Sequence, residues 1–381
     1  MRSLVDDLCN ALDLGHSLAE ITSLLDARTN KGTVSTDTWQ TREIPLIRAI
    51  EKKRLDVINL LLDRETDIKM VGETALAAAV RKGNQEDVSL LLDRGADINA
   101  VGGVFGTALA AAALGGEMEI VSLLLDRAAD INAVGGVFGT ALAAAALGGE
   151  TGIVWLLLDR GADINAVGGT HGTALAAAAS DGNKEILSLL LGQGADINAV
   201  GGTHGTALAV AASDGNKEIV SLLLDQGADI NAVGGTHGTA LTAAVFKGSE
   251  EIVSLLLDRG ADINAVGGTH GTALAAAAST GSEEILLLLL GLGANINAVG
   301  ATHGTALAVA ASDGNKEIVS LLLDQGADIN AVGGTHGTVL AAAESKGNGE
   351  IVSLLRNCGA HVMRVGGSYQ TVSGVYTNTL K

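Results

Sequence analysis

Basic side chains are few in this chain. It carries 24 lysines and arginines against 43 aspartates and glutamates, which gives a formal net charge of −19. An acidic surface repels phosphate backbones, and the sequence has neither a basic stripe nor an arginine-rich arm. Nucleic acid is therefore not expected as a direct partner.

Cysteines, a secretory leader and a membrane-spanning run are also scarce or absent. Cys9 and Cys358 are predicted to be reduced thiols of an intracellular protein, cytoplasmic with a nuclear location possible. The amino terminus has two early aspartates and no sustained apolar core, unlike a signal peptide. The 28 uncharged residues Ile285–Ser312 contain Asn295, Asn297 and four glycines and follow a repeat register, so we predict no membrane span there.

A repeat of 33 residues dominates the sequence. The segment Gly194–Gln226 reads GADINAVGGTHGTALAVAASDGNKEIVSLLLDQ, and its copy at Gly293–Gln325 differs only by Asn295 for Asp196 and Ala301 for Gly202. Self-similarity at such a period is typical of a solenoid, in which each unit buries its apolar faces against its neighbours. We therefore predict one elongated stack.

Each repeat predicts two helices and an extended connection. Thr206 is placed to cap an alanine-rich first helix, and Asn216 to cap a leucine-rich second helix. Gly227 is expected to end that helix in the left-handed conformation. The second helix has too many apolar positions for one stripe, so it should pack between two neighbours. Residues 228–238 then form a glycine-bent connection, here called a finger, which leads to Thr239.

The repeat pattern T-A-L-A-x-A-A-x-x-G-N-x-E-I-V-x-L-L-L-x-x-G-A-D-I-N resembles the ankyrin repeat, whose usual form has T-P-L-H where this chain has T-A-L-A. The G-G-x-ring-G-T-A-L segment is similar to the variant found in ankyrin arrays of filamentous fungi, often behind NACHT modules. The resemblance implies an all-α solenoid of about 10–11 repeats that binds proteins. It implies a divergent capping helix pair and loop at 1–42, the array at 43–371 and a partial repeat or tail at 372–381.

Some positions depart from the family pattern. The histidine of T-P-L-H is alanine at Ala110, Ala143 and Ala209, so another group must fix the finger. Ala128 replaces the helix-ending glycine of one repeat, at a cost of roughly 1 kcal/mol. Pro45, the only proline, is expected in the first turn of a helix.

Two segments near the ends of the array and one short finger are also irregular. Lys31–Thr41 is predicted to be an irregular loop, and Thr371 should begin a partial repeat. The finger Asp67–Glu73 is three residues shorter than the others. First helices are expected to begin at Thr74, Thr107, Thr140, Thr173, Thr206, Thr239, Thr272, Thr305 and Thr338.

One position of the finger, two residues before each threonine, carries a ring in nine successive repeats. This ring column comprises Phe105, Phe138, His171, His204, His237, His270, His303, His336 and Tyr369. Each ring could pack on the next finger or on the start of its helix, or the rings could line a rim that grips a partner. Because helix layers are about 10 Å apart, we expect that spacing between rings. Two histidines could bridge a metal ion, but three or four could not converge on one.

The same spacing limits a pH response of the histidines. Six imidazoles titrate near pH 6.5, but like charges 10 Å apart in water repel by only about 0.4 kcal/mol. Any switch should therefore be weak.

The recurring polar residues and the glycine pairs do not indicate a catalytic or phosphate-binding site. The aspartates that begin each finger and the asparagines two residues later recur in nearly every repeat, which indicates backbone bonding across layers. Catalysis needs two groups that meet in a pocket with shifted pKa values. Gly201 and Gly202 lack the lysine and serine of a phosphate loop. The ladder carboxylates are Asp97, Asp130, Asp163, Asp196, Asp229, Asp262 and Asp328, and the amides run from Asn99 to Asn330.

The sequence thus predicts a non-catalytic interaction scaffold or sensing surface without cofactor, metal or catalytic residues. Its candidate partner-binding residues are the ring column. The alternative is an enzyme or a small-ligand or metal-binding protein that uses the histidine fingers. Phe246 and Trp155 are the other large anchors, and we interpret Trp155 as a chance substitution in a serine column.

Overall fold

The computed structural model describes residues 4–29, 43–64, 68–300 and 304–360, which form 22 α-helices and no β-strand. The helices follow one another in pairs, one pair for each repeat, which confirms an all-α repeat fold. They are α1 Leu4–Asp13, α2 Leu18–Thr29, α3 Glu43–Glu51, α4 Leu55–Arg64, α5 Ile68–Arg81, α6 Gln85–Asp93, α7 Ala108–Leu114, α8 Met118–Asp126, α9 Ala141–Leu147, α10 Thr151–Asp159, α11 Ala174–Asp181, α12 Lys184–Gly192, α13 Ala207–Asp214, α14 Lys217–Asp225, α15 Ala240–Lys247, α16 Glu250–Asp258, α17 Ala273–Thr280, α18 Glu283–Gly291, α19 Ala306–Asp313, α20 Lys316–Asp324, α21 Val339–Ser345 and α22 Gly349–Asn357.

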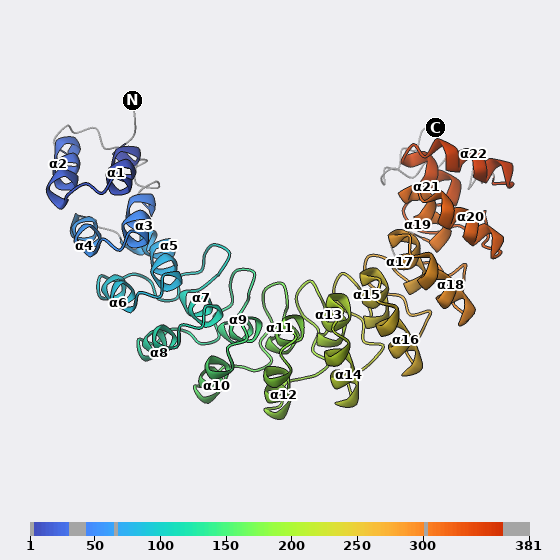
Figure 1. The fold of residues 1–381 in the computed structure, drawn as a ribbon, viewed down its shortest axis with the longest axis horizontal. Coiled ribbons are helices and arrows are strands. Elements are labelled where there is room, and N and C mark those ends of the chain that lie inside the picture. The colour runs from blue at the N-terminus through green and yellow to red at the C-terminus, as the bar shows by residue number, and fades with distance from the viewer. Residues whose placement is uncertain (1–3, 30–42, 65–67, 301–303, 361–381) are drawn as a thin grey trace, which may run out of the picture. The chain divides into compact units, whose positions relative to one another are not determined.

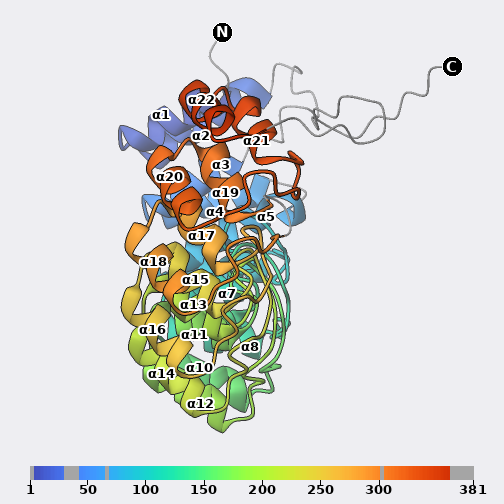
Figure 2. The same ribbon diagram turned by 90° about the vertical axis from the view of Figure 1, so that its right-hand side faces the viewer.

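The chain divides into two compact units. The first comprises residues 1–170 and 188–194, and the second comprises 171–187 and 195–381. Within each unit the odd-numbered helices pack on one another and form one layer, and the even-numbered helices form a second layer beside it (Figure 1). The fingers leave the odd-numbered layer as loops along one edge of each unit (Figure 2). The core lies between the two layers, and the fingers lie outside it.

The first helix of a repeat begins at a threonine because its hydroxyl satisfies an otherwise unpaired amide. Thr206 Oγ1 accepts a hydrogen bond from the backbone N–H of Ala209 at 3.2 Å. The same bond, 3.1–3.3 Å long, occurs at each of the other predicted threonines from Thr107 to Thr338. Asn216 likewise caps α14 through a bond from Ile219 N at 3.1 Å. These predicted caps are confirmed.

The core combines small side chains of the first helix with large ones of the second. All six residues Ala207–Ala212 of α13 are buried, and so are Ile219, Val220 and Leu223 of α14. Leu222 and Leu224 are half-buried. Alanine allows successive first helices to approach closely, and the branched residues fill the space between the layers.

One predicted helix start is wrong. The helix α5 begins at Ile68 and not at Thr74, so helix occupies the place of the short finger. This segment has a single glycine, Gly72, where the other fingers have two or three. Without those bending residues the backbone continues as helix.

Other expectations are confirmed where they fall on described residues. The amino-terminal helix pair is α1 and α2, and Pro45 lies in the first turn of α3. Ala128 adopts the left-handed conformation with φ of 64°, as Gly227 does at 88°. In the described part of the chain no helix is long and apolar enough to cross a membrane. Lys31–Thr41 and the partial repeat from Thr371 lie outside the described residues.

Candidate recognition face

Most of the described fingers are closed by their own backbone, and several are tied to the next finger. Gly234 donates its N–H to the carbonyl of Gly238 at 2.9 Å, which closes the loop. Thr236 N–H donates to the carbonyl of Thr203 in the preceding finger at 2.7 Å, and Thr269 N–H donates to Thr236 at 2.8 Å. Finger tips bonded in this way approach to about 4.8 Å, the spacing of neighbouring strands.

Glycine is required where the fingers touch. A β-carbon on Gly238 would lie 2.5 Å from the carbonyl oxygen of Gly267, and one on Gly234 would lie 2.5 Å from Val200 Cγ1. Val200 is half-exposed and packs one methyl group on that glycine. These bonds and contacts hold the fingers in place of the missing T-P-L-H histidine.

The amide ladder also joins neighbouring repeats. Asn198 Oδ1 accepts a hydrogen bond from Asp229 N at 2.7 Å, across the repeat boundary. Asp229 Oδ1 accepts from Asn231 N at 2.9 Å within its own finger. Bonding across layers is thus confirmed for the asparagines, whereas the Asp229 carboxylate bonds within its own finger. Both groups serve the backbone.

Three pairs of neighbouring rings in the column stack on one another, one pair in the first unit and two in the second. Ring centroids are 5.6 Å apart for Phe105 and Phe138, 5.3 Å for His171 and His204, and 6.4 Å for His204 and His237. The predicted 10 Å spacing is wrong because the hydrogen-bonded finger tips lie closer together than the helices behind them. His336 is half-buried. His303 and Tyr369 lie outside the described residues.

The first unit has apolar finger tips. Phe105 and Phe138 are half-buried, and Val104 beside them is 59% exposed. Leu114, the last residue of α7, lines a surface hollow with Phe105. The guanidinium carbon of Arg81 lies 5.5 Å from the centre of the Phe105 ring, a cation–π distance.

The second unit replaces this apolar set with polar groups. The last residues of its first helices include Ser213, whose hydroxyl lies 3.5 Å from His237 Nε2. Phe246 interrupts the serines and is wedged between two rings, with centroid distances of 5.3 Å to His237 and 4.9 Å to His270. It remains 43% exposed. Phe246 therefore extends the ring column sideways onto α15.

Burial holds two of the histidines towards the neutral form. The pKa of His171 and that of His237 are lowered by desolvation and further by the nearby His204, and Asp214 opposes both effects. Ser180 Oγ donates to Asp214 Oδ2 at 2.8 Å. The buried Nδ1 atoms of His171 and His237 have no hydrogen-bond partner among the described residues.

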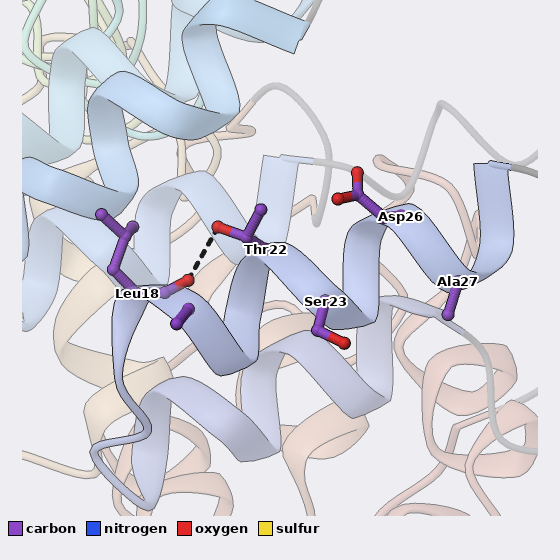
Figure 3. Close-up of a pocket in the computed structure, with 6 residues that line it drawn as sticks. Leu18, Thr22, Ser23, Asp26 and Ala27 are labelled. Atoms are coloured by element: carbon purple, nitrogen blue, oxygen red, sulfur yellow. Dashed lines mark hydrogen bonds between the residues drawn. The ribbon is translucent and has the colours of Figure 1, made fainter.

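Catalysis or metal binding needs several polar side chains that meet at one point. In the described ranges, no three His, Cys, Asp or Glu side chains come close enough to hold a metal ion. A second hollow is lined by α2 alone and offers one carboxylate, Asp26, beside Thr22 and Ser23 (Figure 3). The Thr22 hydroxyl donates to the carbonyl of Leu18, one turn earlier in α2, at 2.7 Å.

Sequence reasoning named Phe246 as a large anchor but not its place beside the ring column, and it missed Arg81 and Leu114. Arg81, Leu114 and Phe246 occupy one position of the period, at the carboxyl end of the first helix, and all three contact a ring or share a hollow with one. The signal was available because this position is large or charged in some repeats and serine in others. We call the described rings of the column and these neighbours the recognition face, of which each unit carries its own part.

Comparison with known families agrees with the geometry. The family model for ankyrin repeats (3 copies) matches residues 8–101, 103–168, 168–234, 233–299 and 274–365. A comparison with curated proteins gives no match. The helix pairs, fingers and matched ranges together cover nearly all of the chain. It belongs to the ankyrin repeat family.

Proposed function

We propose that this chain is a non-catalytic protein-binding scaffold or sensing surface, and that it binds its partner through the recognition face. Ankyrin repeats are generally protein-interaction modules. The observation that carries the proposal is the ring stack, in which half-buried rings lie outside the helix core and Phe246 stays 43% exposed between two of them. Aromatic side chains held rigidly at a surface are typical binding anchors.

The burial of the odd-numbered helices favours binding through the finger tips over binding through those helices. The alanines of the odd-numbered helices are buried in the core, for example throughout Ala174–Ala179. They present no large side chains to a partner. Binding energy must therefore come from the finger tips and the helix ends beside them.

The test uses two exposed aromatic residues that replace serine in their columns. Phe246 lies on the recognition face, and Trp155 is 51% exposed on α10 in the even-numbered layer. A photo-crosslinking amino acid is placed at one position or the other in cells of the source organism, and crosslinked proteins are identified by mass spectrometry. We expect a specific protein at position 246 and not at 155. Equal crosslinking at both positions, or at 155 alone, would refute the recognition face.

A second pair of variants measures affinity once that partner is purified. Phe246→Ser installs the residue found at Ser213 and Ser279, so it should fold normally, and Trp155→Ser is its control. Loss of an aromatic anchor should weaken binding by about 2 kcal/mol, whereas the control should bind like the parent. Unchanged affinity of Phe246→Ser would count against the proposal.

We further propose a cytoplasmic or nuclear location and a fungal-type array that works with a NACHT module. The fingers' G-G-T-H-G-T-A-L pattern supports the array type, and the free thiols Cys9 and Cys358 suit a reducing compartment. Microscopy of the tagged chain tests the location. Sequencing the surrounding reading frame tests the association with a NACHT module.

A further inference from the structure

Arg81 is a cation on the recognition face that forms no ion pair with any described residue. Other arginines of the first unit, Arg94, Arg127 and Arg160, bind the aspartate of the preceding repeat at 2.8–3.2 Å. Arg81 is exposed, and no carboxylate of the described residues lies within 4.0 Å of it. Its guanidinium instead lies over the Phe105 ring at 5.5 Å. This cation is thus available on a chain whose net charge is −19.

The hollow beside Arg81 is apolar at its base and charged at two edges. Its lining comes from the end of α5, the Phe105 finger and the turn between α7 and α8, and includes Val80, Arg81, Phe105, Ala111, Leu114 and Glu117. The Glu117 carboxylate lies over Gly83, where a β-carbon would meet its oxygens at 2.8 and 3.0 Å. The hollow therefore has a positive edge at Arg81 and a negative edge at Glu117.

Resting on the proposed function, we infer that this hollow binds a peptide segment of the partner in which a large apolar residue stands next to an aspartate or glutamate. The apolar side chain packs on Phe105 and Leu114, and the carboxylate binds the Arg81 guanidinium. A guanidinium stacked on a ring keeps its N–H edge free for a carboxylate. Glu117 repels a second acidic group and thus sets the direction of the peptide.

The test begins with an unbiased probe. The full chain, the Arg81→Glu variant and the control Arg127→Gln are each used to select from a phage-displayed library of random 12-residue peptides. We expect the parent and the control to enrich a large apolar residue beside Asp or Glu. Arg81→Glu should enrich Lys or Arg beside the apolar residue instead. Recovery of the same sequences by Arg81→Glu and the parent would overturn the inference.

Synthetic peptides then isolate the contact. The selected peptide and its Asp→Asn or Glu→Gln form are titrated by fluorescence anisotropy against the parent and Arg81→Gln. Each single change should weaken binding about tenfold, and the two together should be no worse, since they remove one contact. Additive losses would overturn the inference. Because Arg81 is exposed, its variants should retain the far-UV circular dichroism of the parent.

Failure here is distinguishable from failure of the proposed function. Selected peptides that bind Arg81→Gln as tightly as the parent, or no selected peptide at all, refute the Arg81 hollow. Crosslinking at position 246 in the second unit does not involve this hollow, so it decides independently whether the recognition face binds a protein.

Discussion

Substitution of Gly238 by alanine should destabilise the second unit much more than the same change at Gly227. Both glycines have positive φ, 80° and 88°, so each alanine incurs about 1–2 kcal/mol of backbone strain. A β-carbon at Gly227 would meet nothing within 4 Å. At Gly238 it would lie 2.5 Å from the Gly267 oxygen and 2.7 Å from Gly268 N, both backbone atoms of the next finger.

Backbone atoms cannot turn away as a flexible side chain can. Overpacking of this kind typically adds about 1–3 kcal/mol, so Gly238→Ala should lose about 2–5 kcal/mol in total. The added loss arises only from contact between neighbouring fingers. The comparison thus measures how much the packed finger tips stabilise the unit.

Urea titration followed by far-UV circular dichroism provides the assay, with Gly227→Ala as the matched control. The two variants have the same chemistry and the same backbone strain, and they differ only in the neighbouring finger. A lower midpoint for Gly238→Ala with an unchanged slope would support the reasoning. Equal midpoints would refute it and would show that the fingers do not pack as described.

Three further changes test other parts of the structure. Ala128→Gly should raise stability by about 1 kcal/mol in urea titration, because it relieves a φ of 64°; no gain would contradict the strain. Stability should be full above pH 6.5 and fall as the pH drops below it, since the lowered pKa values of His171 and His237 leave the folded state binding fewer protons than the unfolded chain. Changing both histidines to phenylalanine should flatten the dependence of stability on pH between pH 7.5 and 5.5. An unchanged dependence would show that other groups cause it. Asn198→Ala should cost about 1–2 kcal/mol in thermal or urea unfolding because it removes the acceptor for Asp229 N, and a neutral result would show that water replaces the amide.

The histidine stack revises the expected strength of a pH response. At the observed 5.3 Å between His171 and His204, two positive rings repel by about 0.8 kcal/mol in water and by about 3 kcal/mol at the effective dielectric of a protein surface. At a spacing of 10 Å the repulsion in water would be about half as large, about 0.4 kcal/mol. Adjacent histidines are therefore unlike independent surface groups, and acidification should act on the finger tips first.

The sequence by itself determined everything that depends on neighbours along the chain. The threonine caps, the Asn216 cap and the left-handed Gly227 and Ala128 follow from local backbone chemistry, and each recurs at a period of 33 residues. The pairing of helices follows from that period because a single repeat cannot bury its own apolar faces. Phe246 was recognised as a large anchor but its contacts were not.

Only the tertiary structure decided how one repeat meets the next. The stacking of His171 on His204 depends on bonds between finger backbones, and the position of Arg81 over Phe105 joins residues of different repeats. A period gives the order of the layers, but the distances between them depend on which atoms come into contact, and these distances place the recognition face.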